Sequence, residues 1–334
     1  MKEKDLRLSN VRAFSCIAIV VLHTFFATSV SFEYGSNSYI ICIVIRNLML
    51  WAVPCFMMVT GALLLDPLKT VNYKKVFGKY IPRMLTALVI FSVIFKLIDI
   101  ILGLDPLETA VTDTIKEILT GKGQWAHMWY LYTMTALYLI IPLLRPFAEH
   151  ASKREIIAVM IIMILFLSLI PFITGLAGFD SGFYIPIYTI YPLFLLLGFF
   201  LHHKYFDYQS IIIITIVGYL VGITAFTLKY INNDDELLKG LVSNYSFPLT
   251  IIGSIGMFMI LRRLRISKIF INLIDENSFG IYLIHMIPLK LIMNYIHPEK
   301  YGLLFVIIIA VGVFISSLII TALLKKIPGI SKIL

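Results

Sequence analysis

Long apolar segments recur along the whole chain and constrain its fold more than any other feature. Runs of about 20 apolar residues alternate with short polar stretches through all 334 residues. A helix of that length crosses about 30 Å of hydrocarbon. Inside lipid no water can hydrogen-bond the backbone, so a chain crosses a membrane only as helices or as a closed β-barrel. The short alternating strands of such a barrel do not occur in the sequence. We therefore expect an all-α, polytopic membrane helical bundle.

The composition agrees with this interpretation. Hydrophobic residues make up 60% of the chain and charged residues only 14%, which is too apolar to cover the surface of a soluble protein of this size. The net charge of +9 then indicates basic loops beside anionic lipid, and we expect no nucleic-acid partner. The three cysteines fall inside predicted spans without metal-ligand spacing, so we expect small core residues and no metal site.

The apolar segments predict about ten transmembrane helices. The second of them is long and contains Pro54 and Gly61, which predicts a kink or a break. No internal repeat or soluble domain interrupts the series, so we expect one domain over residues 1–334. The ten predicted spans lie near residues 11–31, 38–65, 84–104, 126–145, 155–174, 184–201, 210–229, 245–261, 278–296 and 302–324.

Lysine and arginine predict the orientation of these spans. With the N-terminus in the cytoplasm, 19 of these cations fall in cytoplasmic segments and five in outer loops. Cytoplasmic loops of membrane proteins carry such an excess of positive charge. Both termini are therefore predicted to be cytoplasmic.

The first predicted span contains two ionisable residues, Arg12 and His23. Eleven residues of helix make about three turns plus roughly 20°, so both side chains share one face, about 16 Å apart along the axis. Ionisable groups at membrane depth are costly and normally face a cavity or a partner. An interfacial anchor and a hydrogen-bonded bundle histidine remain the structural alternatives.

Further polar residues occur at similar depth. His127 lies at the outer end of the fourth span and His285 lies within the ninth, while Arg46 in the second span has no obvious partner. Lys96 and Asp99 are three residues apart on one helix, which predicts a local ion pair. Histidines beside hydroxyl groups can support general-base chemistry because imidazole titrates near neutral pH.

A basic loop follows the second span in the segment VNYKKVFGKYIPR. Its cations, Lys74, Lys75, Lys79 and Arg83, suit either a phosphate-bearing ligand or lipid head groups. The sequence contains no H-x-x-E-H, G-x-S-x-G or Walker motif, so metal-dependent hydrolysis and phosphate-loop ATP hydrolysis have no support.

Five segments in order resemble the acyltransferase-3 family of integral membrane acyltransferases. They are Arg12-x10-His23, VPCFMMVTGALLL at 53–65, the basic loop, HMWYLYTMTALYLIIPLL at 127–144 and SFGIYLIH at 278–285. The chain is most similar to the short members of the family, which acetylate surface glycans. It departs from the family in offering Lys75, Lys79 and Arg83 where an R-x-x-R pair is common.

The resemblance implies transfer of an acyl group, usually acetyl, from acyl-CoA to a sugar hydroxyl at the bacterial cytoplasmic membrane. It implies that Arg12 and His23 are essential, with His23 as the base or as the acyl acceptor. Acetyl-CoA or another acyl-CoA is then the donor substrate, and no permanently bound cofactor is expected. Trp129, Ser278, His127 and His285 match family motifs and are further pocket candidates, as is Arg46.

The sequence leaves two matters open. The acceptor is a glycan or a lipid-linked sugar in the favoured interpretation, and membrane lipid is the other partner, but peptidoglycan, teichoic acid, capsule or a small metabolite all fit. The main alternative function is a multispan transporter or flippase, because broken helices with intramembrane charges also suit substrate passage. A membrane sensor or scaffold is a third possibility.

Overall fold

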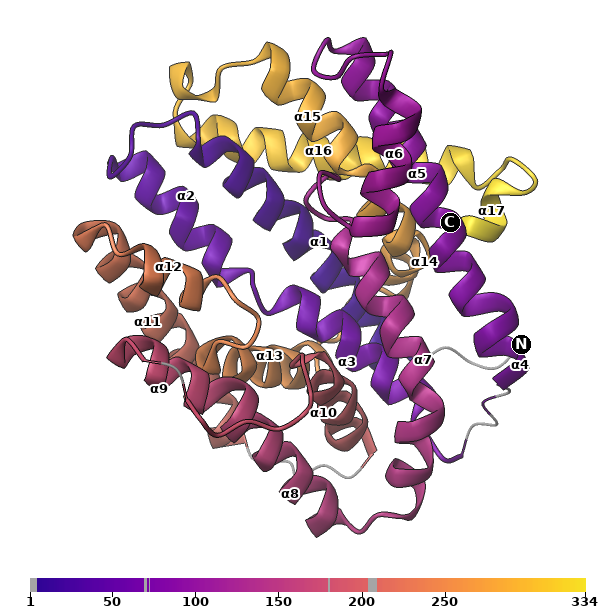
Figure 1. Cartoon of the computed structure of the whole chain (residues 1–334), viewed down its shortest axis with the longest axis vertical. Helices are drawn as coiled ribbons and strands as arrows, with labels where there is room; N and C mark the ends of the chain where they lie inside the picture. Colours follow the sequence, from indigo (N-terminus) through magenta and orange to yellow (C-terminus); the bar gives the residue numbers. More distant parts are fainter. Residues whose placement is uncertain (1–4, 69–70, 72, 180, 204–208) are drawn as a thin grey trace.

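The computed structural model describes residues 5–68, 71, 73–179, 181–203 and 209–334, and within them the regular secondary structure is entirely helical (Figure 1). Seven helical stretches in this part of the chain are long and apolar enough to cross a membrane. The all-α membrane bundle is therefore confirmed, while the count of ten spans and the orientation stay predictions.

The seven stretches differ in regularity, since three of them are built from more than one helical segment. They are α1 (Leu6–Ser29), α2–α3 (Asn37–Leu48 and Ala52–Leu64), α4–η1–α5 (Tyr73–Lys75, Val76–Tyr80 and Ile81–Ile101), α7 (Trp129–His150), α8–η2–α9 (Lys153–Ile164, Leu165–Leu169 and Ile170–Ala177), α11 (Gln209–Asn233) and α16 (Leu303–Leu324). Among the described residues, two shorter apolar helices lie at the sixth and eighth predicted spans, α10 (Tyr191–His203) and α13 (Pro248–Leu261). The ninth predicted span covers the end of α14 (Lys268–Ile284) and the helix that follows it.

Helix α1 lies at the centre of the bundle and is the most buried of the seven stretches. Its N-terminus is capped by Asp5, whose side chain accepts a hydrogen bond from the backbone N–H of Arg7. The helix packs against α2, α3, α13, α14, α16 and α15 (Met286–Tyr295). A polar residue on α1 therefore meets other helices before it meets lipid.

The second predicted span is broken, as expected from its length and its proline. Helix α2 ends at Leu48 and α3 begins at Ala52, so the break lies just before Pro54, which occupies the first turn of α3. Proline is tolerated there because the first backbone N–H groups of a helix have no intrahelical partner. The break redirects the chain between Arg46 and the cavity-lining part of α3.

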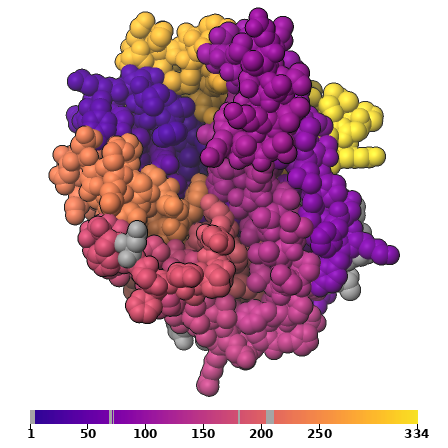
Figure 2. All heavy atoms as spheres, viewed as in Figure 1, coloured from indigo at the N-terminus to yellow at the C-terminus, as the bar shows by residue number. Residues whose placement is uncertain are grey.

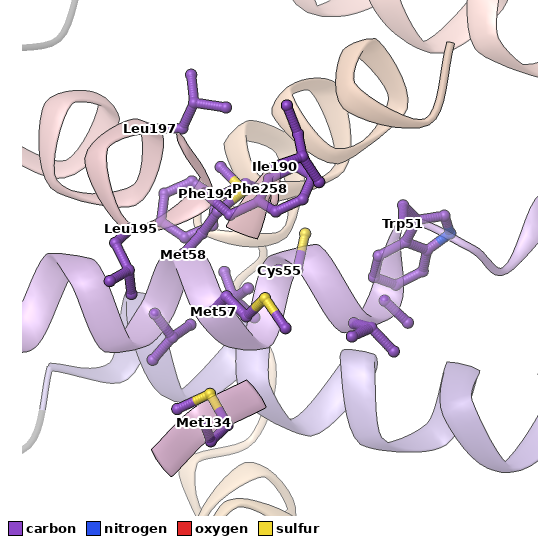
Figure 3. Close-up of a cluster of buried hydrophobic side chains, with 14 of the residues drawn as sticks. Trp51, Cys55, Met57, Met58, Met134, Ile190, Phe194, Leu195, Leu197 and Phe258 are labelled. Carbon is purple, nitrogen blue, oxygen red and sulfur yellow. The ribbon is translucent and has the colours of Figure 1, made fainter. Parts of the chain in front are cut away.

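The closest helix pair, α3 and α10, depends on two glycines. A Cβ atom on Gly61 would overlap the backbone carbonyl of Leu195, and one on Gly198 would overlap that of Met58. Small residues let two membrane helices approach to backbone contact in this way. Figure 3 shows Met58 beside Phe194 and Leu195 in the buried cluster that surrounds this crossing.

The segments predicted to be cytoplasmic gather at one end of the bundle. The Asp5 carboxylate lies 3.2 Å from the His202 ring at the end of α10, and the Asn10 amide donates to the Leu264 carbonyl after α13 (2.7 Å). Arg83 near the start of α5 meets α17 (Ile330–Ile333), and the Lys325 ammonium donates to the Glu276 carbonyl. One face of the molecule thus collects these basic ends.

Two helices at the opposite end of the bundle were not predicted from the sequence. They are α6 (Ala110–Thr120), after α5, and α12 (Glu236–Val242), after α11; a short η3 (Pro298–Lys300) precedes α16. Both helices are too short to span a membrane and too polar to have been selected by an apolar-run search. Figure 2 shows α5, α6 and α7 forming one continuous surface in this view.

The glycine contact between α3 and α10 gives a stability prediction. Gly198→Ala forces the two backbones apart, and overpacking of this kind costs about 1–3 kcal/mol. We expect a clearly lower midpoint of thermal unfolding in detergent. The matched control is Gly218→Ala on α11, where the added Cβ has nothing within 4 Å; it should leave the midpoint unchanged or raise it, because alanine favours helix. Equal effects of the two substitutions would contradict this packing account.

Candidate functional site: a cavity from an arginine–aspartate pair to three histidines

A cavity of about 390 Å³ lies between α1, α3, α5, α7 and α14, lined at one end by Arg12 and Arg83 and at the other by His23. Its walls combine apolar side chains of α3 with aromatic side chains of α7 and α14. Arg12 and His23 share one face of α1, as the spacing predicted, and both line the cavity. The cavity therefore runs along α1 over about 16 Å, from its N-terminal part towards its middle.

Arg12 is paired with an acid that the sequence analysis did not identify. Its Nη1 lies 2.7 Å from Oδ1 of Asp275 on α14, and Ser9 donates a hydrogen bond to the other carboxylate oxygen (2.9 Å). The Asp275 side chain is 1% exposed and the Arg12 side chain 27% exposed, so the arginine keeps a surface towards the cavity. The pair fixes the guanidinium and joins α1 to α14.

Three histidines from different segments meet at the deep end of the cavity. The His23 ring centroid lies 5.1 Å from that of His285 and 6.4 Å from that of His127, and the latter two are 5.3 Å apart. His285 occupies the junction between α14 and α15. Pro288 follows in the next turn and removes a backbone hydrogen bond there, which explains the break.

The hydrogen bonds of two of these rings define their tautomers. His285 Nδ1 lies 2.7 Å from the Tyr282 carbonyl and His127 Nε2 lies 3.3 Å from the Leu283 carbonyl, and a carbonyl can only accept. The remaining nitrogens, Nε2 of His285 and Nδ1 of His127, are buried without a hydrogen-bond partner. Each is therefore an acceptor placed beside His23.

His23 differs from the other two rings in being available for a ligand. It is partly exposed and lines the cavity, and within the described residues it makes ring contacts but no hydrogen bond. The tyrosine ring of Tyr282 lies against His127, and its hydroxyl donates to the His127 carbonyl. His127 and His285 are thus fixed by the backbone, and His23 is the partly exposed ring without a hydrogen bond among the described residues.

The other predicted pocket residues divide into two groups. Trp129, Ser278 and His127 line the cavity, and the Ser278 hydroxyl donates to the Asp275 carbonyl (2.8 Å). His285 contacts the lining histidines, whereas Arg46 lies outside the lining and donates to Ser243 (2.9 Å).

Of the four predicted donor-binding cations, Arg83 lines the cavity and the three lysines do not. Arg83 lines it, with its guanidinium 4.6 Å from the Phe279 ring centroid and donating to the carbonyls of Ile333 (2.8 Å) and Leu334 (2.6 Å). Lys74, Lys75 and Lys79 are exposed and lie outside the lining. Within α4 and η1, only Tyr80 at the end of η1 reaches the cavity lining.

The expected ion pair between Lys96 and Asp99 is wrong. Lys96 binds the carboxylates of Asp105 and Glu117, both at 2.6 Å, while Asp99 accepts from Trp125 Nε1 (2.8 Å) and pairs with Lys290. Glu117 lies on α6, a helix that was not predicted, so its contact with Lys96 could not be expected from the sequence. These pairs hold α6 and α15 against the C-terminal end of α5.

Asp275 and Tyr282 are the site residues that sequence reasoning missed. Together with Ser278 and His285 they recur at spacings of three, four and three residues, which places all four on one face of a helix. That helical spacing was the available signal. No three His, Cys, Asp or Glu side chains in the described part of the chain are arranged to hold a metal ion.

Comparison with known proteins decides the family. The sequence matches the acyltransferase-3 family, described as an acyltransferase domain, over residues 5–323. The chain belongs to the acyltransferase-3 family. It is accordingly an acyltransferase and a multipass membrane protein, as the sequence predicted.

A curated relative extends the comparison over nearly the same length. The chain is 23% identical over 327 residues, covering 88% of this chain and 85% of the relative, to the probable poly-beta-1,6-N-acetyl-D-glucosamine export protein of Staphylococcus aureus (strain MRSA252). No protein of known structure matches the sequence.

The pairing of Arg12 with Asp275 leads to a double-mutant prediction. Arg12→Ala leaves a buried carboxylate uncompensated, so we expect lower thermal stability in detergent. Adding Asp275→Ala should recover part of the loss, with a coupling free energy of about 0.5–3 kcal/mol. Strictly additive effects on the unfolding free energy would contradict the pair.

Proposed function

We propose that the protein is an O-acetyltransferase that moves an acetyl group from acyl-CoA to a glycan hydroxyl, with His23 as the catalytic residue. The observation that carries this proposal is the position of His23, an available imidazole at the deep end of a cavity whose other end holds two arginines. Family membership gives the reaction class, and the relative named for a glycan supports a glycan acceptor.

The donor enters from the end of the cavity that holds Arg12 and Arg83, which the charge distribution predicts to be cytoplasmic. Guanidinium groups bind phosphate oxygens through two parallel hydrogen bonds, so these side chains suit the phosphates of CoA. Lys74, Lys75 and Lys79 lie outside the lining and attract the anionic donor at longer range. The narrow pantetheine arm then extends past the apolar residues of α3 and places the thioester beside His23.

His23 takes the proton of the acceptor hydroxyl as its oxygen attacks the thioester carbonyl carbon. The carbon–sulfur bond then breaks, and His23 returns the proton to the leaving CoA thiolate, so protons and electrons balance. The second N–H of the protonated imidazole can donate to the unpartnered nitrogen of His285, the nearer of the two rings. A two-step route through an acetyl group on the His23 ring uses the same geometry.

Export of a glycan is the second candidate function, favoured by the name of the staphylococcal relative. A helix broken beside the cavity and intramembrane cations also suit a transport path. The two functions differ in their need for a donor, since transport alone releases no CoA. Uptake of a glycan into proteoliposomes without acyl-CoA would favour export.

The acyl-transfer proposal predicts the behaviour of a His23 variant. Purified protein in nanodiscs with radiolabelled acetyl-CoA should release CoA, and His23→Asn should bind acetyl-CoA but release CoA about 10²–10⁴-fold more slowly, because a general base is missing. Label retained on the wild-type protein would identify the two-step route.

The matched control is His297→Asn, whose side chain is 63% exposed and distant in sequence from the cavity residues. It should keep the wild-type rate. Wild-type protein that neither binds nor cleaves acetyl-CoA would contradict the proposal, as would His23→Asn with the wild-type rate of CoA release.

A further inference from the structure

Arg46 on α2 is a partly buried arginine that has no acidic partner within the described residues. Its Nη1 donates to the amide oxygen of Asn47 (2.5 Å) and to the hydroxyl of Ser243 (2.9 Å), and its Cζ lies 5.3 Å from the Phe26 ring centroid. Its Nε is buried without a hydrogen-bond partner. The guanidinium edge formed by Nε and Nη2 is therefore unused by described residues.

The other cations at similar depth are compensated by acids. Arg12 pairs with Asp275, Lys96 with Asp105 and Glu117, and Lys290 with Asp99. A charged side chain away from water is stable when it is paired with an opposite charge and hydrogen-bonded. Two neutral hydrogen-bond acceptors compensate the charge less well than an acid does. Arg46 contacts only neutral groups among the described residues, which favours a ligand as its negative partner.

The surroundings of Arg46 are fixed in advance. Asn47 is fully buried, and its amide donates to Thr227 Oγ1 (2.9 Å) and to the Tyr230 hydroxyl (3.2 Å). Because both amide hydrogens point towards α11, the amide oxygen is directed at Arg46. Residues of a binding site are commonly held in this way by a second layer of hydrogen bonds.

Arg46 lies on the opposite side of His23 from Arg12 along α1. Phe26, which lies against the guanidinium, follows His23 by three residues on α1, whereas Arg12 precedes His23 by eleven. Ser243, which accepts from Arg46, is two residues from Tyr245, and Tyr245 lines the cavity. His23 thus lies between a cationic donor end and Arg46.

An aromatic cluster adjoins this position. The Trp129 ring centroid lies 5.6 Å from that of Tyr191 and 5.4 Å from that of Tyr245, and all three rings are partly exposed. Such rings offer an apolar face with a polar edge, which suits the C–H face and the hydroxyl groups of a sugar. The cluster and the unused guanidinium edge together offer contacts for a sugar and for an anion.

We propose that Arg46, Ser243 and the rings of Trp129, Tyr191 and Tyr245 form the acceptor subsite, and that the acceptor is an anionic glycan. A carboxylate of an acidic sugar or a phosphate of the glycan binds the Nε–Nη2 edge of Arg46 through two parallel hydrogen bonds. The sugar ring packs on the aromatic cluster, which brings a hydroxyl towards His23. The assignment of this site to the acceptor rests on the proposed acetyl transfer. The anion site itself rests only on the contacts of Arg46.

Binding of three defined probes tests the anion site without any chemistry. They are a glucuronic acid oligosaccharide, a glycerol phosphate oligomer and a neutral glucose oligosaccharide of equal length. We expect at least one anionic probe to bind wild-type protein about tenfold or more tightly than the neutral probe, and Arg46→Gln to abolish that preference. The probe that binds distinguishes carboxylate from phosphate.

Arg154→Gln is the matched control, since Arg154 is an exposed arginine on α8, and it should keep the preference. If Arg46→Gln does not fold, Arg46→Lys replaces it: the point charge without the planar fork should weaken binding of the anionic probe and leave the neutral probe unchanged. The proposal is overturned if neither anionic probe binds more tightly than the neutral one, or if the Arg46 variants keep the wild-type preference.

Acetyl-CoA turnover measured on the same samples separates this proposal from the proposed function. Binding that depends on Arg46, without any release of CoA, would leave the anion site standing and refute the acetyl transfer. Release of CoA that depends on His23, without any anion preference, would refute the anionic acceptor alone.

Discussion

A charge in the apolar interior of a membrane protein needs a partner, and the structure is organised around this need. Lys96 draws α6 onto α5 by binding Glu117, and Lys290 draws α15 onto α5 by binding Asp99. Arg12 joins α1 to α14 through Asp275. The pairs of Lys290 and Arg12 join elements distant in sequence, and the pair of Lys96 with Glu117 joins two consecutive helices. In each case, burying one ion alone costs more than closing the loop between the partners.

The residues proposed to act in function lie where this pairing is incomplete. His23 has no hydrogen bond among the described residues, the neighbouring rings of His127 and His285 each keep one unpartnered nitrogen, and Arg46 keeps an unused edge. Unsatisfied polar groups are rare in a well-packed interior, and the unpartnered nitrogens of His127 and His285 lie beside His23 at one cavity, which favours ligand binding there. In the proposed function, the cavity joins a donor end at Arg12 and Arg83 to a reacting centre at His23, and Arg46 lies outside the cavity lining on the acceptor side.

The sequence predicted the helices well and the contacts between them poorly. Apolar runs locate helices because lipid leaves the backbone no alternative, and the spacing of Arg12 and His23 correctly placed both on one face. The partner of Lys96 was missed because α6 carries too little apolar sequence to be recognised beforehand. Asp275 was missed because its partner lies 263 residues away, and helix packing, which local spacing does not encode, brings the two together.

The central claim is that one cavity places the acyl donor against His23. A cryo-EM structure of the protein with an unreactive acetyl-CoA analogue, in which a methylene group replaces the thioester sulfur, tests it most directly. The account predicts the analogue's phosphates beside Arg12 and Arg83 and its carbonyl group in contact with the His23 ring. An analogue bound outside the cavity, or with its carbonyl group remote from the three histidines, would contradict it.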